Sequence, residues 1–232
     1  MRPLSGSGLP SATPDVIYSP PPDEGLDVIY HDEAMVVVNK PSGLLSVPGR
    51  GDGREDCMVS RVMLDFSDAL IVHRLDMATS GLLVLARGED MQRRLSMLFQ
   101  DRRVSKRYVA LVHGLMSQDA GEVNLPLITD WPHRPKQMVC HERGKPSLTR
   151  FSVDSRDAQL WQTRVSLEPV TGRSHQLRVH MLASGHPIVG DPLYGDEALQ
   201  SAWPRLMLHA SEITLPHPVT GVDLALRCPV PF

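Results

Sequence analysis

Short aliphatic and β-branched runs, each ended by glycine, proline or polar residues, constrain the fold more than any other feature of this sequence. Residues 35–38 and 81–86 lack the alternation of a half-exposed strand, so they are predicted to be strands buried on both faces. Further runs of strand character occur at 27–30, 70–72, 108–113, 149–153, 162–167, 206–210 and 222–226. A chain with this pattern is predicted to build its core around a β-sheet.

Helical periodicity appears in three segments between these runs. The shared apolar faces of the first two consist of Val59, Val62, Met63 and Phe66, and of Met91, Leu95, Leu98 and Phe99. The third segment, residues 175–183, is followed by Gly185, which is well placed to end a helix. Because strands and helices do not alternate regularly, the predicted fold class is α+β with a mixed sheet.

The first 25 residues differ from the rest in composition, since they hold six prolines, three glycines, four serines and few large apolar side chains. Such a segment cannot bury enough apolar surface to offset the entropy lost on ordering it. We therefore expect a disordered tail over residues 1–26 and one domain over residues 27–232.

The sequence also bounds the setting in which the chain works. Its longest aliphatic stretch, residues 82–86, is far shorter than a membrane span, and no secretory signal pattern opens the chain. Cys57, Cys140 and Cys228 are scattered, which argues against a disulfide framework and against a paired-cysteine metal site. A soluble cytoplasmic protein is expected.

The net charge of −3 argues against a nucleic-acid partner until its distribution is considered. Residues 1–33 carry a net charge of −5, so the remainder carries +2; within it, residues 87–107 carry +4 and residues 130–150 carry +3. Of the 24 basic residues 20 are arginine, the type suited to phosphate and base contacts. These segments indicate a polyanionic partner, although a biased genomic base composition also explains the arginine content.

Residues 72–81 form a polar loop that carries Asp76 between two strongly apolar strands. A carboxylate at the end of a strand is well placed for catalysis, but an aspartate in such a loop also commonly caps a turn. Tyr108 likewise has two interpretations, as a platform for base stacking or as a core residue of its strand. The residue pattern leaves both choices open.

Residues 171–180 concentrate polar side chains at the start of the third helix. Arg173 near the helix N-terminus is able to hold an anion or to pair with a carboxylate. His175 and His180 are five positions apart, which does not place two metal ligands on one helical face, so both are interpreted as hydrogen-bonded structural residues. No phosphate-binding glycine motif is present, and no motif links Cys57 to a histidine base.

Seven segments, taken together and in order, resemble the RluA family of pseudouridine synthases. They are residues 38–44, 73–81, 108–112, 144–146, 171–180, 185–191 and 208–210. The resemblance runs from about residue 27 to the C-terminus, and residues 45–50 and 127–137 are similar to a branch of the family that acts on two kinds of RNA. Members of that branch have no N-terminal RNA-binding domain of the S4 type, and none is expected here.

This resemblance implies an α+β domain of pseudouridine synthase type, with a mixed, largely antiparallel sheet and peripheral helices. It implies an enzyme that breaks the N-glycosidic bond of a uridine in RNA, turns the uracil and rejoins it through C5. Because nothing is added or lost overall, neither a cofactor nor a metal ion is expected. The implied partners are tRNA, through an anticodon stem-loop, and a loop of large-subunit ribosomal RNA. The protein is expected to be a monomer.

Residue roles follow from the same resemblance. Asp76 aligns with the catalytic aspartate, Arg173 with the arginine that pairs with it, and Tyr108 with the tyrosine that stacks under the uracil and is a candidate to remove the C5 proton. Arg74 aligns with a residue that fills the space left by the flipped nucleotide. Other positions expected to contact substrate or RNA are His73, Thr79, Leu177, Leu208, Arg93, Arg94, Arg102, Arg103, Lys106 and Arg107. For Leu177, plain core packing is an equal alternative.

Three other functions compete with this interpretation. The same isomerisation at a different tRNA or rRNA site is one. A noncatalytic RNA-binding module that has kept the fold is another, but binding alone requires neither Asp76 nor an arginine partner. A hydrolase of glycosidic bonds is the third; such enzymes generally use two carboxylates, and no second acid occupies a matching segment.

Overall fold

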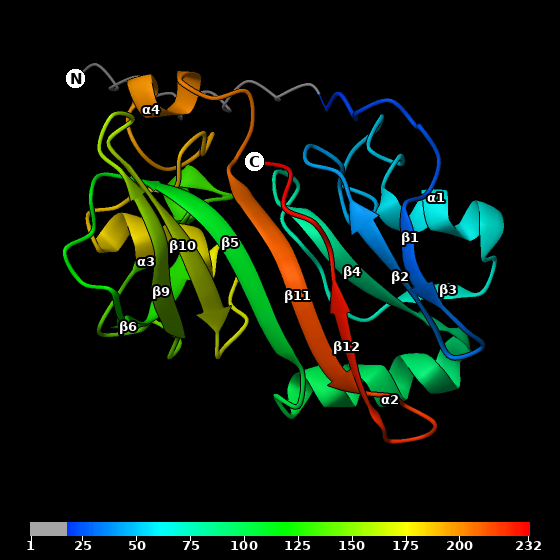
Figure 1. The fold of residues 1–232 in the computed structure, drawn as a ribbon. Helices are drawn as coiled ribbons and strands as arrows, with labels where there is room; N and C mark the ends of the chain where they lie inside the picture. The colour runs from blue at the N-terminus through cyan, green and yellow to red at the C-terminus, as the bar shows by residue number, and fades with distance from the viewer. Residues whose placement is uncertain (1–17) are drawn as a thin grey trace, which may run out of the picture.

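The computed structural model of the chain describes residues 18–232. Its centre is a ten-stranded sheet in which the strands follow the order β1-β2-β4-β11-β5-β10-β9-β6, with β3 paired to β4 and β12 paired to β11 (Figure 1). These strands are β1 (Val28–His31), β2 (Met35–Lys40), β3 (Ala69–Ile71), β4 (Ser80–Arg87), β5 (Ser105–His113), β6 (Ala120–Asn124), β9 (Leu148–Asp157), β10 (Gln162–Pro169), β11 (Leu208–Pro216) and β12 (Asp223–Arg227).

The sheet is mixed but largely antiparallel, as expected. Among its described pairings only β4 and β11 run parallel, with His209 opposite Ser80 and Ala210 opposite Gly81. Gly81 has a φ of +111°, and a Cβ there would lie 2.3 Å from the carbonyl oxygen of Ala210. Glycine is therefore required where the two strands meet. The predicted α+β fold is confirmed.

The two strands expected to be buried on both faces are central in the sheet. Residues 35–38 of β2 are fully buried, and β4 is buried over its first seven residues. The continuous aliphatic runs arise because apolar clusters pack on both sides of these strands.

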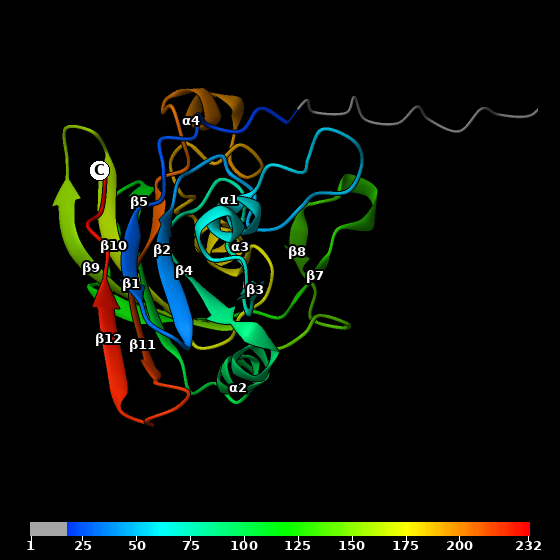
Figure 2. The ribbon, with the colours of Figure 1, turned by 90° about the vertical axis from the view of Figure 1, so that its right-hand side faces the viewer.

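The described helices are α1 (Met58–Asp65), α2 (Gly88–Gln100), α3 (Gln176–Ala183) and the short α4 (Glu197–Ser201). Figure 2 shows α1 and α3 on the same side of the sheet, together with a separate hairpin formed by β7 (Leu127–Thr129) and β8 (Gln137–Val139). This hairpin pairs with no strand of the main sheet. The 3-10 turn η1 (Trp131–His133) lies at its tip.

The predicted helices are present, with one error on the first. Met63 was expected on its buried face but is 44 % exposed, whereas Val62 is fully buried. Gly185 follows α3 with a φ of +81°, which confirms its predicted role at the end of that helix. The sequence did not predict β6, β7, β8 or α4, because these elements have three to five residues and too few apolar positions to show a period.

The predicted tail falls only partly within the described residues. Residues 1–17 lie outside them, and residues 18–26 lie against α1 and the loop before it. The hydroxyl of Tyr18 donates to the carbonyl of Asp56 at 2.9 Å, and Arg61 donates to the carbonyl of Pro21 at 2.6 Å. Residues 18–26 therefore contact the domain that was predicted for residues 27–232. Across residues 18–232, no helix is long and apolar enough to cross a membrane.

Candidate active site

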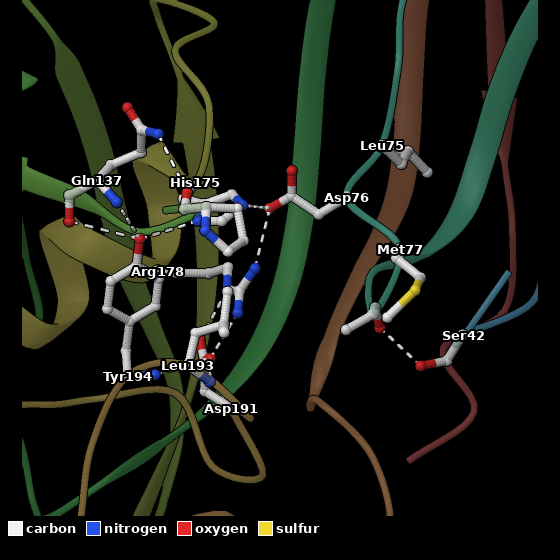
Figure 3. A network of polar contacts seen from close by, with 12 residues as sticks. Ser42, Leu75, Asp76, Met77, Gln137, His175, Arg178, Asp191, Leu193 and Tyr194 are labelled. Carbon is white, nitrogen blue, oxygen red and sulfur yellow. Dashed lines mark hydrogen bonds and ion pairs between the residues drawn. The ribbon is translucent and has the colours of Figure 1, made fainter. Parts of the chain in front are cut away.

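Asp76 lies in the loop between β3 and β4, immediately before the parallel junction with β11. Its backbone carbonyl accepts a hydrogen bond from Thr79 at 3.0 Å, which closes the turn. The residues after β2 hold this loop from the other side: the amide of Gly43 donates to the carbonyl of Met77, and the hydroxyl of Ser42 donates to that of Ala78 at 2.6 Å (Figure 3). The carboxylate is therefore fixed by its neighbours and remains partly exposed.

Lys40 is buried beneath this loop, and no separate role was predicted for it. Its ammonium group donates to three carbonyls, those of Pro41, Leu44 and Met77, at 2.6 to 3.1 Å. Burial lowers the pKa of Lys40 to about 7, although the charge of Asp76 acts in the opposite direction. The lysine thus ties the end of β2 to the residue that follows the catalytic candidate.

Arg178, on α3, is the arginine that contacts the Asp76 carboxylate. Its Nη1 lies 3.3 Å from Oδ2 of Asp76, while Nε and Nη2 donate to both oxygens of Asp191 at 2.7 and 2.6 Å. Burial opposes the charged form of Arg178, but Asp191 and then Asp76 outweigh it, so its pKa is raised. A bidentate carboxylate pair of this kind holds the guanidinium in one orientation.

The prediction that Arg173 pairs with Asp76 is wrong. Arg173 is exposed in the turn before α3, where its Nε donates to the carbonyl of Pro146 at 3.3 Å and its amide to the side chain of Gln176. α3 begins at Gln176, so Arg173 precedes the helix, whereas Arg178 lies on a turn of the helix that faces the sheet. Two arginines five positions apart could not be distinguished without the helix boundary.

His175 also belongs to the site. It precedes α3 in the left-handed region, with a φ of +53°, and its Nδ1 lies 2.8 Å from the hydroxyl of Tyr194. Its Nε2 lies 3.9 Å from Oδ2 of Asp76 (Figure 3). Burial lowers the pKa of His175, aided by Arg178 and opposed by Asp76. The purely structural interpretation of this histidine is therefore revised.

His180 does have the structural role that was predicted for it. It is buried, and its two ring nitrogens bind the hydroxyl of Thr149 at 2.9 Å and the carbonyl of Leu125 at 3.0 Å. Within residues 18–232, no group of three or more His, Cys, Asp or Glu side chains is arranged to hold a metal ion.

Tyr108 lies on β5 and packs against two of the apolar clusters of the core. Leu177 and Leu208, both predicted to line the uracil pocket, belong to one of these clusters and are buried. Burial raises the pKa of the Tyr108 hydroxyl, and the nearby charge of Asp76 raises it further. The phenol of Tyr108 is therefore neutral. It lies within electrostatic range of the Asp76 carboxylate and packs against apolar core residues.

His73 and Thr79, expected to contact substrate, have structural contacts instead. The ring of His73 stacks on Phe99 with centroids 4.4 Å apart, and its Nε2 accepts the amide proton of Val84 at 3.0 Å. Burial holds the pKa of His73 at about 3, so the ring is a neutral acceptor. Thr79 is buried in the turn after Asp76. Arg74, in the same loop, is exposed.

The six basic residues predicted to bind RNA do not form one surface. Arg93 and Arg94 on α2 both form ion pairs with Asp90. On β5, side chains alternate between the faces of the sheet, so Lys106 shares the face of Tyr108 and Arg107 points to the opposite one. The remaining two, Arg102 and Arg103, are exposed in the turn that joins α2 to β5.

Comparison with known proteins agrees with this geometry. Residues 34–183 match the model of the family described as RNA pseudouridylate synthase. The chain is 50 % identical over 215 residues to the dual-specificity RNA pseudouridine synthase RluA of Salmonella typhi, which covers 93 % of this chain and 98 % of that protein. The corresponding protein of Escherichia coli K12 is 49 % identical over 215 residues, which again cover 93 % of this chain and 98 % of that protein.

Solved structures give the same answer. The human RNA pseudouridylate synthase domain containing 1 superposes with a TM-score of 0.78 at 30 % identity, covering 92 % of this chain and 87 % of that one. The human protein called RNA pseudouridylate synthase domain containing 4 superposes with a TM-score of 0.72 at 27 % identity, covering 88 % of each chain. The extent of these matches, together with the site around Asp76, shows that the chain belongs to the RNA pseudouridylate synthase family.

Proposed function

We propose that this chain converts specific uridines of RNA to pseudouridine, with the carboxylate of Asp76 as the reacting group. The observation that carries this proposal is the position of that carboxylate. It is partly exposed, its Oδ2 faces Arg178, and its charge acts on the hydroxyl of Tyr108, which packs against the apolar core. A guanidinium in contact with Asp76 fixes the orientation of the carboxylate.

The ionised carboxylate has three routes to open the N-glycosidic bond. It attacks the ribose C1′ or the uracil ring, or it removes a ribose proton on a glycal route. The freed uracil then turns and bonds to the ribose through C5, and the C5 proton leaves. Every atom of the uridine is retained apart from the exchanged proton, so the reaction needs no external group or energy source.

Tyr108 is proposed to stack against the uracil and to take part in removing the C5 proton. Because the pKa of its hydroxyl is raised, the phenol enters the reaction protonated and must release its own proton before it accepts another. That proton passes to solvent water, because a carboxylate is a much weaker base than the phenolate. A phenolate formed in this way is a strong base, which the removal of a carbon-bound proton requires.

RNA is proposed to approach over the face of the sheet that carries Asp76. A target uridine must leave its stack to reach this carboxylate, and the exposed Arg74 is placed to fill the vacated space. Lys106 lies on the same face, and the exposed Arg173 is available for a phosphate in place of a role with Asp76. The curated relatives are dual-specificity enzymes, so we propose tRNA and large-subunit ribosomal RNA as substrates. We further propose that the chain works as a monomer in the cytoplasm.

Mapping of pseudouridines tests this proposal directly. tRNA and ribosomal RNA are compared from cells with the gene, without it, and without it but carrying an Asp76→Asn copy. We expect one anticodon-loop site and one ribosomal loop site to be lost without the gene and to be restored only by the unaltered copy. Restoration by the Asp76→Asn copy would contradict the role of the carboxylate. Release of free uracil would favour the hydrolase, and RNA binding without isomerisation would favour a noncatalytic module.

A further inference from the structure

Two hydrogen bonds and one longer polar contact join the β7–β8 hairpin to the Asp76 site. At one end, the backbone amide of Gln137, the first residue of β8, donates to the hydroxyl of Tyr194 at 2.7 Å. The hydroxyl of Tyr194 in turn lies 2.8 Å from Nδ1 of His175. At the other end, Nε2 of His175 faces Oδ2 of Asp76 at 3.9 Å (Figure 3).

The direction of the bond between Tyr194 and His175 depends on the tautomer of the histidine. The Tyr194 hydroxyl receives the Gln137 amide proton and has one proton of its own to give. Nδ1 of His175 is the nearer acceptor at 2.8 Å, since the carbonyl of Gln137 lies at 3.4 Å. In the tautomer whose Nδ1 accepts the hydroxyl proton of Tyr194, the ring proton resides on Nε2, the nitrogen that faces Asp76.

The hairpin pairs with no strand of the main sheet, and Tyr194 is one of the side chains that hold it in position. Its base rests on a small apolar cluster formed by Leu127, Val179 and Tyr194. Tyr194 is 6 % exposed, and its ring also lies edge-on to His175 at 5.7 Å between centroids. The same side chain therefore supports the hairpin and contacts the histidine.

The tip of the hairpin carries features that suit single-stranded RNA. Trp131 is 65 % exposed, and the guanidinium of Arg134 lies 4.2 Å from the centre of its ring. Lys136 adds a second positive charge beside them. An exposed indole offers a stacking surface for an unpaired base, and the neighbouring cations suit the backbone phosphates. Core packing does not account for an indole this exposed.

We propose that Tyr194 and His175 are positioning residues that couple RNA bound at the hairpin tip to the carboxylate of Asp76. An RNA base stacked on Trp131 fixes the hairpin, and the Gln137 amide then fixes the Tyr194 hydroxyl and the His175 ring. A movement of about 1 Å brings Nε2 of His175 within hydrogen-bond distance of Asp76. The carboxylate is then held by His175 on one side and Arg178 on the other, so correctly bound RNA completes the site. This coupling rests on the proposed function.

Steady-state kinetics of pseudouridine formation test the coupling, with tRNA from cells lacking the gene as the probe. Tyr194→Phe keeps the ring and its packing but removes the hydroxyl. We expect its kcat to fall about tenfold while KM stays within about twofold, because one positioning hydrogen bond is lost and the RNA surface is intact. Tyr30→Phe, which removes a hydroxyl bonded to Asp32 away from the site, is the matched control.

The link to the hairpin is tested by combining variants. Trp131→Ala is expected to raise KM and to lower kcat several-fold, whereas Trp161→Ala, at a similarly exposed tryptophan 54 % accessible to solvent, is the control. In the Tyr194→Phe background, Trp131→Ala should lower kcat no further, since the link is already broken. Independent, multiplicative losses of kcat would overturn the coupling.

A second variant guards against an effect on folding alone. Asparagine tolerates the left-handed backbone of residue 175, so His175→Asn retains an acceptor for Tyr194 but removes the group that faces Asp76. We expect it to lower kcat as Tyr194→Phe does, with thermal unfolding close to that of the unaltered protein. If the unaltered protein is active and the Tyr194→Phe variant is equally active, the coupling is overturned and the proposed function stands. An inactive unaltered protein would overturn the proposed function together with it.

Discussion

Oδ2 of Asp76 lies 3.3 Å from Nη1 of Arg178, although 102 positions separate the two residues in the chain. The same guanidinium forms a bidentate pair with Asp191, which is 1 % exposed. Asp191 therefore holds the arginine, and the arginine holds the candidate catalytic carboxylate. This order of contacts makes the site rigid without blocking the oxygen of Asp76 that remains free.

Replacement of Arg178 should lower kcat even when the positive charge is kept, because the orientation of Asp76 is lost. Arg178→Lys loses the fork that binds Asp191 and points at Asp76, so we expect kcat to fall by about 10²-fold. Arg173→Lys, five residues earlier and exposed, should change kcat by less than about threefold. Rates of pseudouridine formation under saturating RNA distinguish the two. Equal losses from both variants would contradict the assignment of Arg178.

Asp76→Asn should remove activity and retain the fold and the RNA affinity. The amide has the shape of the carboxylate but is neither a nucleophile nor a base at neutral pH. We expect turnover below detection, with a Kd for tRNA within about threefold of that of the unaltered protein. Filter binding and pseudouridine analysis give both quantities, and Asp65→Asn, at an exposed position on α1, is the control. Measurable turnover by Asp76→Asn would exclude the carboxylate as the reacting group.

Tyr108→Phe should separate stacking from proton transfer. Phenylalanine keeps the aromatic face, so RNA affinity should be unchanged, whereas loss of the hydroxyl should lower kcat by about 10²-fold or more. Release of tritium from RNA labelled at uracil C5 reports the proton step itself. Normal tritium release would remove Tyr108 from that step and leave it only a stacking role.

RNA affinity should depend on which face of β5 a cation occupies. Lys106→Ala, on the face of Tyr108, is expected to weaken tRNA binding and to reduce the slope of log Kd against log salt concentration by about one. Arg107→Ala, on the opposite face, should leave that slope unchanged. Fluorescence titrations at several salt concentrations provide the comparison. Equal effects of both variants would show that RNA does not favour the Asp76 face.

His73 should make stability depend on pH. Its folded pKa of about 3 lies below the ordinary value of 6.5, so between these values the unfolded chain binds a proton that the folded protein does not. The free energy of unfolding should therefore fall as the pH falls from about 6.5 towards 3, by up to about 1.4 kcal/mol per pH unit. His73→Gln should reduce this slope in urea titrations, and an unchanged slope would contradict the assignment to His73. Part of the pH dependence of the free energy of unfolding will remain in His73→Gln, because the pKa of His209 is also lowered, to about 4.

Much of the fold could be predicted from local patterns. The continuous aliphatic runs of β2 and β4 indicated strands buried on both faces, and Gly185 marked the end of α3. Met63 was misplaced because helical periodicity ranks several residues as apolar without showing where the packing surface ends. The β7–β8 hairpin was missed because its strands have three residues each, too few to show a period.

The candidate site divides in the same way. The sequence by itself determined the family, the Asp76 loop and the position of Tyr108, because these depend on ordered motifs that can be read along the chain. Only the tertiary structure decided that Arg178 rather than Arg173 contacts Asp76, that His73 packs inward, and that Arg107 faces away from Tyr108. It also brought His175 and Tyr194 to the carboxylate. Contacts of this kind depend on the start of a helix and on the alternation of a strand, which set side-chain direction and which no local motif records.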